Sequence, residues 1–145
     1  MKLGIAASLI AIFVVPQAAP HEELILSNVD VIKTFDQTKP TNIRGVIKKV
    51  EWVNPHAWIT AEIKNANSSR TNWHVELASA AALRRRGIRP EDLALQKSCS
   101  VEDWPSRDGT KTAYGRKLTL AGGRSFEVGN RFFEDLPASQ SRQMK

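Results

Sequence analysis

Alternation of apolar and polar residues predicts β-strands along most of the chain after Pro40. His56 to Lys64 is the clearest case, because every second residue is aliphatic, as in a strand with one buried face. Further strands are expected at Thr71 to Leu77, Ser98 to Trp104, Thr112 to Leu120 and Arg124 to Val128. The predicted buried face carries Ala57, Ile59, Ala61 and Ile63, and then Trp73, Val75 and Leu77.

The segment from Thr41 to Asn54 has apolar residues in both phases and a glycine, Gly45, in its interior. This pattern predicts a long, curved strand with a bulge or tight bend at Gly45, as at the corner of a barrel. Asn54-Pro55 then indicates a turn.

Between the third and fourth predicted strands, Ser79 can cap a short helix over Ala80 to Arg86, which Gly87 ends. The order is therefore three strands, one short helix and two or three more strands. Closure of such a sheet removes its exposed edges. We predict an all-β fold, an OB-like closed or partly open barrel of five to six strands, with a β-sandwich as the alternative.

The N-terminus predicts export. Lys2 precedes an apolar run of 13 residues, Leu3 to Val15, which suits a signal peptide and is shorter than the roughly 20 residues of a membrane span. The small residues Ala18 and Ala19 follow this run, as is typical before a signal-peptide cleavage site. We expect removal of residues 1–19 and a periplasmic or secreted protein. The alternative is an uncleaved N-terminal anchor.

Length and composition limit the number of domains and the kinds of cross-link that the chain can have. The 145 residues correspond to one domain, with a formal net charge of +6. We expect an N-terminal extension at 20–40, in which Asp30 to Lys39 is a polar approach to the barrel, the barrel itself at 41–136 and a disordered tail at 137–145. The single cysteine excludes an internal disulfide framework, and its apolar phase places Cys99 in the core.

The outward positions of the second and third strands form a candidate ligand-binding face, which consists of Asn54, His56, Trp58, His74 and Glu76. A hairpin that pairs Ile63 with Trp73 places His74 opposite Glu62, and Thr60 opposite Glu76. A metal site is the alternative, because imidazoles and carboxylates bind copper or zinc. Its candidate ligands are His21, His56 and His74, with Glu62 and Glu76 beside His74.

Charge is densest at the end of the predicted helix, where Arg84, Arg85, Arg86 and Arg89 lie close together. Cations in the last turn of a helix complement its dipole. The same cluster is a candidate contact for an anionic partner, either a membrane surface with anionic headgroups or an acidic protein face.

Four stretches after residue 40 carry a more specific pattern. They are GVIKKVEWVNPHAWITAEI (45–63), WHVELASAAALRRRGI (73–88), WPSRDG (104–109) and LTLAGGR (118–124). These stretches resemble a family of small exported bacterial proteins, known as a domain of unknown function, whose W-x-N-P-H-A string ends here at Ala57. The resemblance covers about Phe35 to Arg124 and implies an exported, barrel-like domain with no assigned reaction.

The chain departs from the pattern of this family in four places. Pro20-His21-Glu22 replaces His-His-Ser, Ile88 replaces a tryptophan at the helix end, Gln96-Lys97 replaces a Gly-Asp turn, and Asp103 replaces a glycine. We expect altered packing at the helix end and an altered loop and strand end.

Candidate catalytic chemistry is missing from the sequence. Ser79, Ser98, Ser100 and Ser106 do not lie in a nucleophile elbow or near a histidine in a known pattern. We expect an exported, non-enzymatic binding module without a cofactor, whose partner is a small molecule or a protein. Export argues against nucleic acid as the ligand, and the oligomeric state stays open. The alternative function is a periplasmic copper- or zinc-binding protein, and a small hydrolase is the third hypothesis, which activity towards ester and phosphoester panels tests.

Titration of the mature protein with copper and zinc distinguishes the binding module from the metal-binding protein. A binding module that does not use metal shows no tight, stoichiometric uptake. Tight binding that is lost in His56→Ala or His74→Ala would establish the metal-binding alternative.

Overall fold

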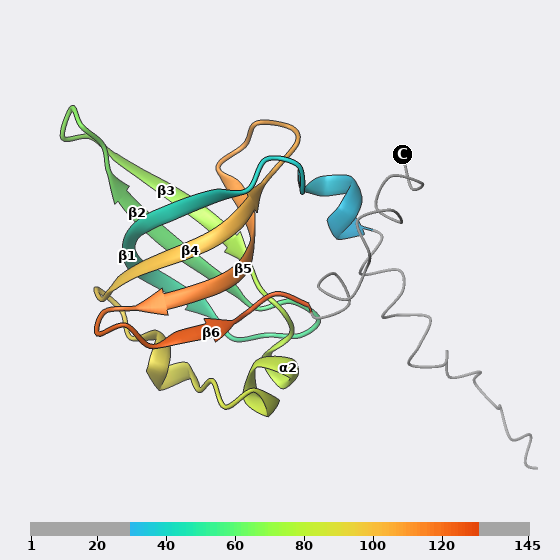
Figure 1. The fold of residues 1–145 in the computed structure, drawn as a ribbon. Coiled ribbons are helices and arrows are strands. Elements are labelled where there is room, and N and C mark those ends of the chain that lie inside the picture. Colours follow the sequence, from blue (N-terminus) through green and yellow to red (C-terminus); the bar gives the residue numbers. More distant parts are fainter. Residues whose placement is uncertain (1–29, 131–145) are drawn as a thin grey trace, which may run out of the picture.

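The computed structural model describes residues 30–130, which form the all-β barrel that the sequence predicts (Figure 1). The described strands are β1 (Thr41–Glu51), β2 (Trp58–Lys64), β3 (Arg70–Glu76), β4 (Ser98–Pro105), β5 (Thr112–Leu120) and β6 (Ser125–Glu127). The predicted signal peptide at 1–19, the first half of the extension and the predicted tail at 137–145 lie outside the described residues.

The strands follow the order β3-β2-β1-β4-β5-β6, and β3 also pairs with β5. This last pairing is parallel, and it closes the first five strands into a barrel. Strand β6 adds to β5 as a short antiparallel hairpin. The topology is the OB-like arrangement predicted from the sequence, rather than the alternative β-sandwich.

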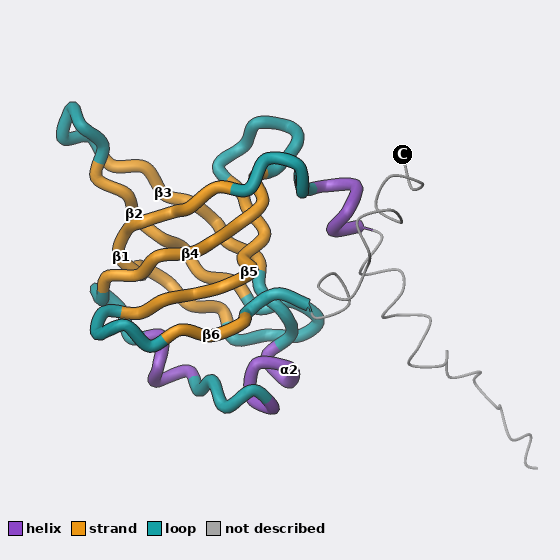
Figure 2. The backbone as a smooth tube through the Cα atoms, viewed as in Figure 1, coloured by secondary structure: helices purple, strands orange, loops and turns teal. Residues whose placement is uncertain are grey.

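Short helical segments connect β3 to β4 where the sequence places them. Helix α2 (Ala80–Arg85) begins after Ser79, whose Oγ accepts a hydrogen bond from the Ala82 amide at 3.1 Å. It ends at Arg85 with Arg86 as its C-cap, and Gly87 follows with a φ of +80°. The 3₁₀ helix η1 (Pro90–Leu93) follows. Figure 2 shows both segments together at one end of the barrel.

The core lies inside the barrel and uses the predicted alternation. Ile59, Ala61, Val75 and Leu77 are fully or almost fully buried, while Ile63 and Trp73 are half-buried and pack against this core. Cys99 is also buried among these residues. Burial raises the pKa of the Cys99 thiol to about 11, so this thiol stays protonated at neutral pH.

Strand β1 takes part in both halves of the barrel. Its residue Val46 pairs with Glu62 of β2 and with Ser98 of β4. At the neighbouring Gly45, an added Cβ would lie 2.4 Å from the carbonyl oxygen of Glu62, so only glycine allows this approach. The β1–β2 register shifts later, between Ile47 and Lys49. The bulge is therefore two or more residues beyond the predicted position, whereas the close backbone approach is at Gly45.

The predicted register of the β2–β3 hairpin is wrong by two residues. Trp73 lies opposite Ala61 rather than Ile63. The strands extend into the predicted loop as far as the pair Lys64–Arg70, which leaves residues 65–69 as the connection. A shift of two residues keeps every side chain on its predicted face, because side chains in a strand alternate with a period of two.

This shift changes which polar side chains lie opposite each other. His74 faces Thr60 instead of Glu62, and Glu76 faces Trp58 instead of Thr60. The predicted grouping of His74 between Glu62 and Glu76 is therefore not formed.

The described part of the N-terminal extension, from residue 30, is not the polar approach that the sequence predicts. Residues 30–34 are helical, and Val31 and Phe35 are buried against Trp104 and Tyr114 of the barrel wall. The Phe35 and Tyr114 rings lie 5.7 Å apart, and Trp104 stacks on Tyr114 at 5.8 Å. This cluster forms a second, smaller core on the outside of the barrel.

Three of the four positions at which the chain departs from the expected family pattern lie in the described range, whereas Pro20-His21-Glu22 lies outside it. Ile88 is completely buried in the main core. Asp103 is also buried, and burial raises the pKa of its carboxyl group. Its carboxyl oxygens accept hydrogen bonds from the Thr41 hydroxyl at 2.6 Å and from the Ile43 amide at 3.2 Å. Gln96 is exposed and has a φ of +62°, a conformation that favours glycine.

We expect Gln96→Gly to stabilise the protein by about 0.5–1 kcal/mol, because glycine removes the steric cost of the left-handed conformation. Urea unfolding followed by circular dichroism measures this change. Gln96→Ala is the matched control, since it shortens the side chain but keeps its Cβ, and we expect no gain from it. Equal stability of the wild type and Gln96→Gly would contradict the prediction.

Candidate functional site

The turn between β1 and β2 brings His56 against Glu76, the last residue of β3. The His56 Nδ1 atom forms a short ion pair with Glu76 Oε1, and both side chains are mostly buried, with 22% and 11% exposed. The Glu76 carboxylate raises the pKa of His56 by hydrogen bonding to its ring, and the charge of Asp30 adds to this increase. Burial of the ring has the opposite effect and lowers the pKa. The corner therefore favours a protonated imidazole.

The neighbouring residues of the predicted ligand-binding face have separate contacts. The Asn54 Oδ1 accepts a hydrogen bond from the Ala81 amide at 3.2 Å. This contact fixes the start of helix α2. Trp58 is half-buried and lies opposite Glu76 in the sheet.

His74 is exposed, and its ring Nδ1 lies 3.4 Å from the Thr60 hydroxyl. It is two residues from Glu76 on the same face of β3. Glu62 pairs instead with Arg70 at 2.8 Å. Within residues 30–130, no three metal-binding side chains come together. His21, the remaining candidate metal ligand, lies outside this range.

The basic end of helix α2 is partly used for packing. Arg86 donates hydrogen bonds to the carbonyl oxygens of Glu127 and Gly129, and thereby holds the segment after β6. The Arg84 guanidinium lies 6.0 Å from the centre of the Trp52 ring. Arg85 and Arg89 are exposed. Two of the four predicted arginines therefore contact the protein itself.

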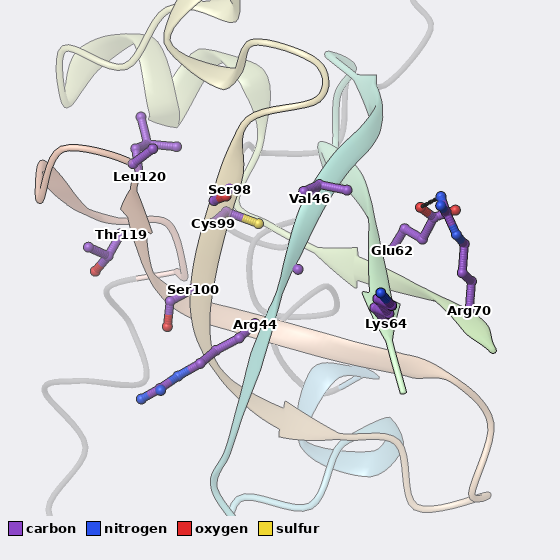
Figure 3. Close-up of a pocket in the computed structure, with 12 residues that line it drawn as sticks. Arg44, Val46, Glu62, Lys64, Arg70, Ser98, Cys99, Ser100, Thr119 and Leu120 are labelled. Atoms are coloured by element: carbon purple, nitrogen blue, oxygen red, sulfur yellow. Dashed lines mark hydrogen bonds and ion pairs between the residues drawn. The ribbon is translucent and has the colours of Figure 1, made fainter. Parts of the chain in front are cut away.

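A hollow of about 640 Å³ lies over the outer surface of the barrel, along the bent part of β1. We call it the basic hollow. Its polar lining comes from β1, β2, β3, β4 and β5 and consists of Arg44, Glu62, Lys64, Arg70, Ser98, Ser100 and Thr119. Figure 3 shows Arg44, Ser100 and Thr119 on one side of β1, and Glu62, Lys64 and Arg70 on the other.

Positive charge dominates this hollow. Its one carboxylate, Glu62, lies 2.8 Å from Arg70 and 3.9 Å from Lys48, so it is already neutralised. Arg44 donates only to the neutral side-chain oxygen of Asn42, at 3.3 Å. Neither Arg44 nor Lys64 forms an ion pair with any residue in the described range. The hollow can therefore accept a negatively charged group.

The sequence contains only an indirect signal for this hollow. The cations of β1 alternate with buried residues and have the pattern of ordinary solvated strand positions. Gly45 is the informative residue, because an interior glycine indicates a close backbone approach. The set of cations around the hollow depends on the pairing of β1 with both β2 and β4. This pairing cannot be predicted from a local sequence pattern.

Helices that could span a membrane are not found between residues 30 and 130. Comparison with known proteins assigns residues 28–115 to a family of unknown function (DUF6152). This match covers more than half of the chain, from before the helical segment at 30–34 into β5, and includes both His56 and Glu76. No curated protein matches the chain.

We expect the His56–Glu76 pair to stabilise the fold by about 1–2 kcal/mol when His56 is protonated. Because the pKa of folded His56 is raised above its ordinary value of 6.5, this contribution is fully present below about pH 6.5. It is lost as the pH rises through the folded pKa. Urea unfolding of the wild type and His56→Gln from pH 5.5 to 9 measures it.

The difference between these two proteins should be largest near pH 6 and should shrink at higher pH. His74→Gln is the control, because this histidine is exposed; its effect should stay below about 0.5 kcal/mol. A His56→Gln effect that is constant with pH would show that the pair does not act through the imidazolium charge.

Proposed function

The chain belongs to this family of unknown function, and we propose that it is an exported, non-enzymatic binding module whose ligand presents an oxyanion to the basic hollow. The single observation that carries the proposal is a pair of cations, Arg44 and Lys64, that have no acidic partner within residues 30–130 and lie at a hollow of about 640 Å³. Ligand sites in proteins commonly have volumes of about 300–1,000 Å³. A phosphate, sulfate or carboxylate group is the chemistry that fits this lining.

The position of the hollow supports an extended ligand. Arg44 and Lys64 lie on opposite sides of β1, as Figure 3 shows, so a ligand that contacts both must cross this strand. The hydroxyls of Ser98 and Thr119 line the same surface. Hydroxyl groups can donate further hydrogen bonds to oxyanions. OB-like barrels commonly bind oligomeric ligands on their outer surface.

Export and the lack of enzymatic chemistry rest on the sequence and on the side chains of the hollow. The apolar run Leu3 to Val15 supports a signal peptide. The thiol of Cys99 is protonated at neutral pH and is therefore a poor nucleophile. Ser100 donates its hydroxyl to Asn42 at 2.8 Å rather than to a base. These features favour binding over catalysis.

The basic end of helix α2 is the competing anion-binding surface. It is the weaker candidate, because Arg86 is engaged with backbone carbonyls and Arg84 with Trp52. Arg85 and Arg89 are exposed there, but neither lines the basic hollow. Variants of the two surfaces with the same change in net charge can therefore distinguish them.

We expect the mature protein to bind vesicles that contain phosphatidylglycerol, or soluble dextran sulfate oligomers, with an affinity that decreases as salt increases. The two probes distinguish a lipid phosphate from a sugar-borne anion. Arg44→Glu and Lys64→Glu should each weaken binding about fivefold, because one exposed charge contact contributes up to about 1 kcal/mol. Vesicle co-sedimentation and fluorescence anisotropy measure these affinities.

Arg85→Glu is the control, since it changes the net charge equally but lies outside the hollow. We expect less than a twofold effect from it. Binding that is lost in Arg85→Glu and retained in the hollow variants would move the anion site to the helix end. Failure of both probes to bind the wild type would refute the proposed ligand chemistry.

A further inference from the structure

A second depression lies at the other end of β1, where this strand faces the segment after helix α2. It has a volume of about 380 Å³ and shares no lining residue with the basic hollow. We call it the Trp52 crevice. One side of the crevice is formed by β1 and the residues just after β1, and the other side by η1 and the residues just after η1. The lining is mainly apolar and includes Val50, Trp52, Leu93 and Leu95, with Lys48 and Lys49.

One of the two large hydrophobic side chains that are exposed within residues 30–130 lines this crevice. Leu95 lines it and is 55% exposed, and Val53, next to Trp52 in the chain, is 49% exposed. Within residues 30–130 these are the large hydrophobic side chains that remain exposed. Exposed apolar surface beside a depression is typical of a binding site.

Trp52 supplies an independent observation. Its indole Nε1 is buried and has no hydrogen-bond partner within residues 30–130. A buried donor without an acceptor costs free energy, because it has lost its hydrogen bonds to water. An acceptor group that enters the crevice can recover this loss after a small movement of the ring.

The charges at the crevice indicate which kind of hydrogen-bond acceptor would bind there. Lys48 and Lys49 line it, and no acidic residue does. Lys48 lies 3.9 Å from Glu62, which is only 16% exposed, whereas Lys49 lies 2.9 Å from Glu51 in a pair of exposed side chains. Such pairs are weak and can exchange with another anion. The crevice is therefore complementary to an apolar group that carries a negative charge.

We propose that the Trp52 crevice binds a single-chain amphiphile with a carboxylate head group, such as a fatty acid. The chain contacts Val50, Leu93 and Leu95, and the carboxylate accepts hydrogen bonds from Trp52 and a lysine. This site is independent of the basic hollow. Either site can therefore be present without the other.

The probe is dodecanoate, titrated below the concentration at which it forms micelles and followed by calorimetry and tryptophan fluorescence. We expect saturable binding to one site per chain. Dodecanol, which has the same chain without the charge, should bind about tenfold more weakly, because a hydrogen bond to a charged group is stronger than one to a neutral group. Trp52→Phe keeps an aromatic ring without the donor and should weaken dodecanoate binding about tenfold.

Leu95→Asp places a carboxylate at the crevice and should weaken dodecanoate binding at least tenfold. Val53→Asp is the matched control, because it changes the other exposed apolar residue outside the lining, and we expect less than a twofold effect. Leu95 is exposed, so its variant should fold, and circular dichroism verifies this.

Three results would overturn the proposal. They are the absence of saturable dodecanoate binding, equal affinity for dodecanol, and an equal loss of affinity in Val53→Asp and Leu95→Asp. A short apolar peptide with a C-terminal carboxylate that binds more tightly than dodecanoate would assign the crevice to a protein partner instead. Phosphatidylglycerol binding through the basic hollow would be unaffected by each of these results.

Discussion

The close contact between Gly45 and the backbone of Glu62 is the constraint on which the barrel depends. β1 can pair with β4 along its first half and with β2 along its second only if it bends across the sheet. At the bend, any side chain larger than hydrogen would overlap the Glu62 carbonyl. Once β1 belongs to both half-sheets, β3 and β5 come close enough to form the parallel pairing that closes the barrel.

The two proposed binding surfaces follow from this bend. The basic hollow lies where β1 passes between β2 and β4, and its cations come from strands that only the bend brings together (Figure 3). The Trp52 crevice lies where the end of β1 meets the segment after η1. Closure also places the end of β3 beside β5, where Glu76 is buried and pairs with His56. Side chains far apart in the sequence thus become neighbours through one backbone contact.

The sequence predicts those features that depend on local patterns. Alternation identifies the buried face of β2, with Ile59 and Ala61, and Gly87 correctly marks the helix end. The strand order and the helix position together predict the OB-like topology. The register of the β2–β3 hairpin is missed, because a shift of two residues leaves every side chain on the same face. That single error hid the His56–Glu76 pair, although both residues were candidates.

Features that depend on distant contacts could not be predicted in this way. Val31 and Phe35 lie in a segment with a polar composition, and only the aromatic surface of Trp104 and Tyr114 explains their burial. Arg44 has the pattern of a solvated strand residue, and its role in the basic hollow arises from the bend at Gly45. Sequence reasoning therefore names His56 and Glu76 as candidates, but it identifies neither their pairing nor the basic hollow.

The free energy of unfolding of Gly45→Ala, measured with urea, tests the central constraint most directly. An added methyl group must displace the Glu62 backbone or separate β1 from β2, so we expect a loss of about 3 kcal/mol or more, or a chain that does not fold. An unfolding free energy within about 0.5 kcal/mol of the wild type would show that β1 bends without this contact, and the explanation of the barrel and of both surfaces would be wrong.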